Sequence, residues 1–135
     1  MATLSEDKII EIFNKQTTDF INTMKSIFPE NVQIKDVSSL IEKGISLNYK
    51  VVINNFYEHI YSKYRAQIVS RNEKFFLNLN FTDLIPSVSS SEVNNFKTLW
   101  TDKRLTKDIR EKCIYSYFDV FVSLCDRYKA YKKTT

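Results

Sequence analysis

Glycine and proline are nearly absent from this sequence, whose 135 residues include one Gly and two Pro. Folds rich in β-strands need glycine repeatedly, because their tight turns use backbone conformations that other residues adopt only at a cost. The scarcity therefore argues against a β-sandwich or barrel. It favours helices joined by short polar loops.

Cysteine and histidine are also scarce. The two cysteines, Cys113 and Cys125, lie in one predicted helix. Twelve residues of helix separate their backbones by roughly 18 Å, whereas a disulfide needs α-carbons within about 7 Å. His59 is the single histidine, and no close cysteine pair exists, so we predict neither a metal site nor a cofactor. Both cysteines are predicted to be buried, inert thiols.

The chain lacks the residue patterns that enzymes use. It has no glycine-rich phosphate loop, and nothing in the sequence places a nucleophile beside His59. The acid pairs Asp7 and Glu11, and Asp108 and Glu111, sit where solvated helix faces usually carry carboxylates. We therefore predict that the protein is not an enzyme and has no small-molecule substrate.

Long apolar runs are missing as well. No run approaches the ~20 residues that span a bilayer. The N-terminal stretch "MATLSEDKII" lacks the charged-then-apolar layout of a signal peptide, and neither end carries a lipidation motif. The sequence predicts a soluble intracellular protein with reduced thiols and no membrane partner.

Core-forming residues, by contrast, are plentiful. Hydrophobic residues make up 43% of the chain and aromatic residues 14%, which is enough for a single domain over residues 1–135. Helical periodicity predicts a compact all-α bundle of about five helices. We expect these helices near residues 5–28, 35–46, 49–69, 91–101 and 106–131.

Short polar side chains mark the expected helix starts. Thr3 and Glu6 have the spacing of a capping box before the first helix. Asp36 and Asn48 are predicted to cap the second and third helices, because their side chains can accept a hydrogen bond from the first turn. The last helix is predicted to begin near Thr106.

The last predicted helix is apolar over at least half of its circumference. The residues of this wide face are Ile109, Cys113, Ile114, Tyr117, Phe118, Val120, Phe121, Leu124, Cys125 and Tyr128. A face this wide predicts contact with several neighbours at once. We therefore expect the C-terminal helix to be the central helix of the bundle.

The excess of positive charge is confined to the second half of the chain. Residues 1–67 balance, so the net charge of +4 comes from residues 68–135. Two regions supply the candidate nucleic-acid or anion contacts: the segment 97–112 and a basic C-terminal tail at about 127–135. The candidates are Lys97, Lys103, Arg104, Lys107, Arg110, Lys129, Lys132 and Lys133. A solvated loop and lysines that complement a helix dipole explain the same residues without a ligand.

Tyr57, Tyr61 and Arg65 follow one another at intervals of four on the edge of the third predicted helix. Exposed aromatic and arginine side chains are frequent in protein interfaces, so these three residues form a candidate partner surface. The alternative is that the tyrosine rings are buried while their hydroxyl groups face water.

Five stretches carry a resemblance to a known group: "FPENVQI", "INNFYEHIYSKY", "NEKFFLNL", "FKTLW" and "EKCIYSYFDVFVSLCDRY". In this order they resemble uncharacterised small all-helical proteins of nucleocytoplasmic large DNA viruses, marseillevirus-like ones among them. The resemblance implies action in an infected cell, in the host cytoplasm, the virus factory, the nucleus or the virion. We predict a non-enzymatic viral interaction protein that acts on a protein partner or associates with itself. Nucleic-acid binding through segment 97–112 and the tail is the alternative.

Overall fold

The structure is a computed structural model that describes residues 4–77 and 100–132. Within these residues every regular element is a helix, and no strand occurs, which confirms the predicted all-α fold. The helix expected near residues 91–101 lies outside the described residues except for its end. No helix in the described ranges is long and apolar enough to cross a membrane.

The first two helices begin at caps that the sequence analysis did not choose. The hydroxyl of Ser5 accepts a hydrogen bond from the Lys8 amide at 3.1 Å and starts α1 (Glu6–Ile27). Thr3, the expected partner of Glu6, lies outside the described residues. The side chain of Asn31 starts α2 (Val32–Leu47) by accepting from the Ile34 amide at 3.0 Å.

The predicted cap of the second helix is therefore wrong, because Asp36 lies inside α2. Both Asn31 and Asp36 have suitable side chains, and the earlier one is used. Starting at Asn31 adds a turn that brings Ile34 into the core, where it is 4% exposed. The added apolar burial favours the longer helix.

The third helical segment is irregular. It consists of α3 (Val51–Asn55), the π-helix η1 (Phe56–Tyr61) and α4 (Ser62–Val69). Asn48 was predicted to cap it, but this residue ends α2 instead. Its side chain accepts from the Lys50 amide at 3.1 Å within the intervening turn. The short helix α5 (Glu73–Leu77) follows.

The last segment is a long rod of three consecutive elements: α8 (Lys107–Arg110), the π-helix η3 (Glu111–Tyr115) and α9 (Ser116–Lys132). The rod begins near Thr106 as predicted, and Thr106 caps it, because its hydroxyl accepts from the Ile109 amide at 3.2 Å. The π turn in η3 was not predicted.

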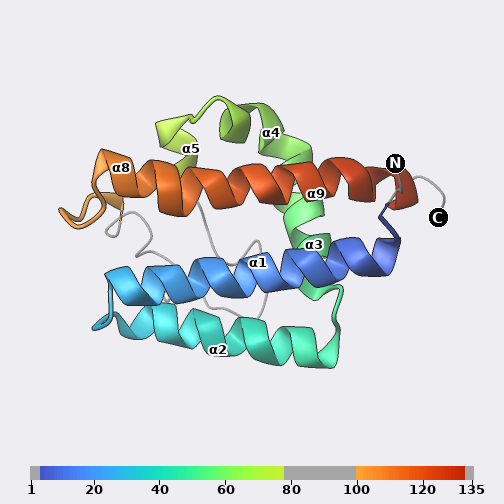
Figure 1. Cartoon of the computed structure of the whole chain (residues 1–135), viewed down its shortest axis with the longest axis horizontal. Helices are drawn as coiled ribbons and strands as arrows, with labels where there is room; N and C mark the ends of the chain where they lie inside the picture. Colours follow the sequence, from blue (N-terminus) through green and yellow to red (C-terminus); the bar gives the residue numbers. More distant parts are fainter. Residues whose placement is uncertain (1–3, 78–99, 133–135) are drawn as a thin grey trace.

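Figure 1 shows the arrangement of these elements. Helices α1 and α2 run side by side, and α9 follows the opposite side of α1. The η1–α4 segment packs on α9 away from α2. The rod therefore has neighbours on two sides, in keeping with its wide apolar face.

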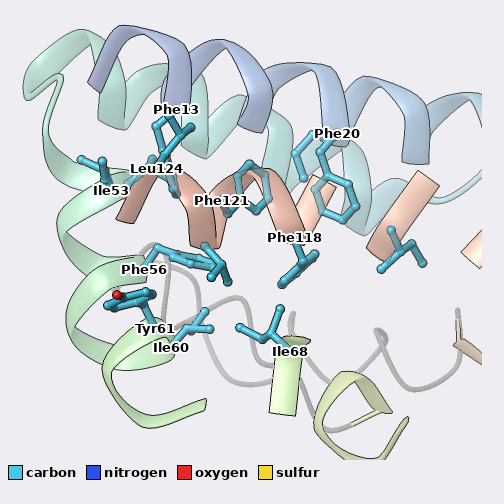
Figure 2. Packing of buried hydrophobic residues seen from close by; sticks show 14 of the residues in the cluster. Phe13, Phe20, Ile53, Phe56, Ile60, Tyr61, Ile68, Phe118, Phe121 and Leu124 are labelled. Atoms are coloured by element: carbon cyan, nitrogen blue, oxygen red, sulfur yellow. The ribbon is translucent and has the colours of Figure 1, made fainter. Parts of the chain in front are cut away.

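Aromatic rings from three elements meet at the middle of α9 (Figure 2). The ring centroid of Phe121 lies 5.0 Å from that of Phe13 on α1 and 5.5 Å from that of Phe56 on η1. It also lies 5.5 Å from Phe118 and 6.2 Å from Phe20. Phe118 and Phe121, from the predicted apolar face of the last helix, are thus part of the buried core.

The two thiols differ in environment. Cys125 is fully buried, which confirms its prediction, and burial raises the pKa of its thiol well above the usual range. Cys113 is partly exposed, so the prediction of burial is wrong for this residue. It lies in the π turn of η3, which changes the side-chain register relative to a regular helix. Both cysteines are free.

Candidate binding sites

Arg104 was predicted to contact an anionic ligand, but its guanidinium is engaged within the protein. It lies 2.5 Å from Glu30 and 3.1 Å from Asp102, and it is 4.6 Å from the ring centroid of Phe28. These hydrogen bonds to Arg104 lower the pKa values of both carboxyl groups. The contacts join the loop before α8 to the end of α1. Arg104 therefore acts as an internal link.

Arg110 is held in a similar way. Its guanidinium stacks 4.5 Å from the ring centroid of Trp100 and donates to the backbone carbonyl of the same residue. One terminal nitrogen lies 3.5 Å from Glu73 on α5. Arg104 and Arg110, two of the cations expected to bind nucleic acid, thus form ion pairs with carboxylates of the same chain.

The other candidate cations do not gather into one patch. Lys103, Lys107 and Lys129 are exposed, whereas Lys132 lies 3.8 Å from Glu58. Lys97 and Lys133 lie outside the described residues. Lys107 and Lys129 are at opposite ends of the rod (Figure 1), separated by roughly 33 Å at about 1.5 Å per residue.

One of the three residues of the predicted partner surface, Tyr61, is buried, whereas Arg65 is exposed. Tyr61 is only 7% exposed, and its hydroxyl donates to Asp126 on α9. Burial and this hydrogen bond raise the pKa of Tyr61 to about 12. Arg65 forms a two-pronged pair with the same carboxylate, at 2.9 and 2.8 Å. Tyr61 is therefore wrong as an exposed contact: its ring is buried, and its hydroxyl bonds to protein. Tyr57 remains partly exposed.

The Asp126 carboxylate is expected to make stability depend on pH. The hydrogen bond from Arg65 holds its pKa below the ordinary value of 3.8. A carboxyl with a lowered folded pKa stabilises the protein above its ordinary pKa, and this stabilisation disappears as the pH falls through the folded value. Asp126 is 39% exposed, so the contribution is at most about 1 kcal/mol.

Urea unfolding of the wild type and of Asp126→Asn tests this expectation. The difference in unfolding free energy should be present at neutral pH and shrink as the pH falls below about 4. Glu11→Gln serves as the control, because the Lys8–Glu11 pair is more exposed. A difference for Asp126→Asn that is the same at neutral and acidic pH would contradict the assigned role of the carboxylate.

An open groove lies where α5 approaches the first turns of the rod. Its volume is about 790 Å³. The lining combines basic, acidic and aromatic side chains: Arg71, Glu73, Lys107, Asp108, Arg110, Glu111 and Tyr115. Lys107 and Arg110 were predicted as anion contacts, and Asp108 and Glu111 were predicted to lie on a solvated face. Arg71, Glu73 and Tyr115 were not predicted, because nothing in the sequence indicates that these distant segments meet.

Arg71 forms one wall of the groove and has an unusual backbone. Its φ of 62° lies in the left-handed region. The amide of Arg71 donates to Ile68 and that of Asn72 donates to Gln67, which is the hydrogen-bond pattern of a Schellman motif at the end of α4. Glycine is the usual residue at this position. An arginine here needs compensating contacts.

The side chain of Arg71 supplies those contacts. Its two terminal nitrogens donate to the two carboxylate oxygens of Asp119 on α9, each at 2.7 Å. One of them lies 3.5 Å from Glu111, and the guanidinium is 5.2 Å from the ring centroid of Tyr115. The α4–α5 turn is thereby clamped onto the rod, and this wall of the groove is fixed before any ligand binds.

Comparison with known proteins gives no analogue for this arrangement. No protein-family model, curated protein or solved structure matches the chain. Across residues 4–77 and 100–132, no group of three or more His, Cys, Asp or Glu side chains is placed to hold a metal ion. Function must therefore be inferred from the groove and the charged side chains around it.

Proposed function

We propose that the protein is a non-enzymatic interaction protein, of a large DNA virus as the resemblance implies, that binds through the groove between α5 and the start of the rod. Its ligand is a protein, either a partner or a second copy of the chain. The observation that carries this proposal is that Arg71 and Arg110, on the groove walls, are already held by internal ion pairs. A surface fixed in advance loses little conformational entropy when it binds.

The chemistry of the lining suits a protein surface better than a reaction. Within residues 4–77 and 100–132, none of the seven side chains that line the groove is a serine, cysteine or histidine, so these seven offer none of the commonest nucleophiles and no imidazole base. Arginine and tyrosine are enriched at the energetic centres of protein interfaces. The lining carries side chains of both charges, and these favour one orientation of a bound partner over others.

Charge balance supports a protein ligand over a nucleic acid. Among the described residues, three basic and three acidic side chains line the groove. Binding to phosphates depends on an excess of cations that displaces counterions, and Arg71, Arg104 and Arg110 are each paired with carboxylates. Nucleic-acid binding would have to rely on scattered lysines such as Lys103 and Lys129.

Site-specific photo-crosslinking in the native cell tests the proposal. A benzophenone side chain placed at position 107 should capture one defined protein or a second copy of the chain. The same group at position 43, an exposed site on α2, is the matched control and should not. Glu111→Lys in the crosslinking variant should reduce capture by about tenfold, because it replaces a complementary charge with a repulsive one. Equal capture at both positions, or capture that Glu111→Lys leaves unchanged, would overturn the proposal.

A salt series tests the nucleic-acid alternative directly. We expect the protein to show no salt-sensitive binding to duplex or single-stranded nucleic acid. Lys103→Glu with Lys129→Glu is the informative variant, because neither lysine lines the groove. Salt-sensitive binding that this double variant abolishes would favour the alternative function.

A further inference from the structure

A second feature lies at the other end of α9, where two tyrosine rings meet nearly at right angles. The ring centroids of Tyr57 on η1 and Tyr128 on α9 are 5.9 Å apart, and the ring planes are inclined by 83°. Tyr61 stacks on Tyr57 with centroids 5.1 Å apart. The Tyr128 hydroxyl donates to the side chain of Asn54 at 2.6 Å. Both rings are therefore fixed by neighbours.

A cation of the same chain lies against both rings. The Lys132 ammonium is 5.8 Å from the ring centroid of Tyr57 and 5.9 Å from that of Tyr128. The Glu58 carboxylate lies 3.8 Å from it. Two inclined rings and one carboxylate are the elements with which proteins bind alkylated ammonium groups. We call Tyr57, Tyr128 and Glu58 the ammonium corner.

The attraction between the Lys132 ammonium and the two tyrosine rings is weak. Attraction between a cation and a ring is significant within about 6 Å of the centroid, and both measured distances are near that limit. A primary ammonium also keeps strong hydration through its three N–H donors. A quaternary ammonium has no N–H donors and is wider, so it fits between two ring faces at a smaller cost in lost hydration.

We propose that the ammonium corner is a binding site for a quaternary ammonium group and that Lys132 is its internal competitor. The lysine belongs to the last turn of α9, and terminal turns open at little cost. An external ligand therefore has to displace the Lys132 side chain from the two rings. The proposal concerns a different part of the rod from the groove and does not depend on the groove's function.

Titration with tetramethylammonium chloride, followed by amide chemical shifts at constant ionic strength, tests the site. Lys132→Ala should bind this probe about three- to tenfold more tightly than the wild type, because the competitor is gone. Lys129→Ala removes an exposed lysine three residues earlier and should bind like the wild type. No gain for Lys132→Ala, or an equal gain for Lys129→Ala, would overturn the proposal.

Two variants in the Lys132→Ala background identify the atoms that bind. Tyr57→Leu should weaken binding by about tenfold or more, since it removes one ring face. Glu58→Gln should weaken it by about threefold, and Glu58 is 56% exposed, so this substitution leaves the core intact. Unchanged affinity in Glu58→Gln together with unchanged affinity in a folded Tyr57→Leu would refute the site.

The same background separates two sources of the ligand. Choline represents a free quaternary ammonium compound, and a short peptide with one trimethylated lysine represents a modified protein. The reference is the same peptide with an unmodified lysine. If choline or the trimethylated peptide binds more tightly than this reference, the site is supported, and the tighter probe shows whether the ligand is a free compound or a modified protein. Failure of both probes to exceed the unmodified peptide would refute it.

Discussion

Phe121→Ala is expected to lower the free energy of unfolding by about 3–5 kcal/mol. Phe121 is 4% exposed, and its ring lies within 6.2 Å of four other phenylalanine rings. Removing it leaves a cavity at the point where α1, η1 and α9 meet, and the fixed helices around it cannot close the gap fully. Urea unfolding followed by circular dichroism measures the change.

Val120→Ala is the matched control for this prediction. Val120 is the preceding residue on α9 and is 36% exposed, so its truncation should change the unfolding free energy by roughly 0.5 kcal/mol. Similar losses for both variants would show that Phe121 does not occupy the centre of the core.

Arg71→Ala is expected to cost about 1.5–3 kcal/mol, because it removes hydrogen bonds from a charged group to Asp119 while alanine keeps the left-handed backbone. The side chain is 32% exposed, so water weakens the pair only in part. Arg71→Gly loses the same contacts but adopts φ of 62° without a Cβ clash. It should be about 1 kcal/mol more stable than Arg71→Ala.

Comparing Arg71→Ala with Arg71→Gly separates the backbone contribution to the unfolding free energy from the side-chain contribution. Unfolding of Arg71→Ala, Asp119→Ala and the double variant completes a thermodynamic cycle, in which the double variant should lose less than the sum of the single losses. An Arg71→Gly protein less stable than Arg71→Ala would contradict the assigned left-handed conformation. Additive losses in the cycle would contradict the clamp.

The sequence predicts the helices because their apolar residues recur with helical spacing, and this signal is local. The start of the rod near Thr106 was predicted correctly. The start of α2 was missed because Asn31 and Asp36 are both suitable caps. The choice between them depends on whether Ile34 finds a place in the core. Tertiary packing decides that, and no local pattern contains it.

The groove was beyond prediction for a related reason. Arg71 contacts Asp119, a residue 48 positions away. A count of charges along the chain correctly found an excess of cations in residues 68–135, but it does not show which cations are paired. Arg104 and Arg110 therefore looked available for a ligand, whereas each is bound to a carboxylate from another segment.

The π turn of η3 separates α8, which carries groove residues, from α9, which carries core residues. Regular helix rotates by about 100° per residue, and a π turn accommodates an additional residue within an otherwise α-helical rod. Loss of a single residue between Glu111 and Tyr115 would restore ordinary winding. The aromatic face of α9 would keep its contact with α1, while the groove residues of α8, Lys107, Asp108 and Arg110, would rotate around the axis of the rod. A single-residue deletion would thus reorient this end of the molecule and leave the core between α1 and α9 in place.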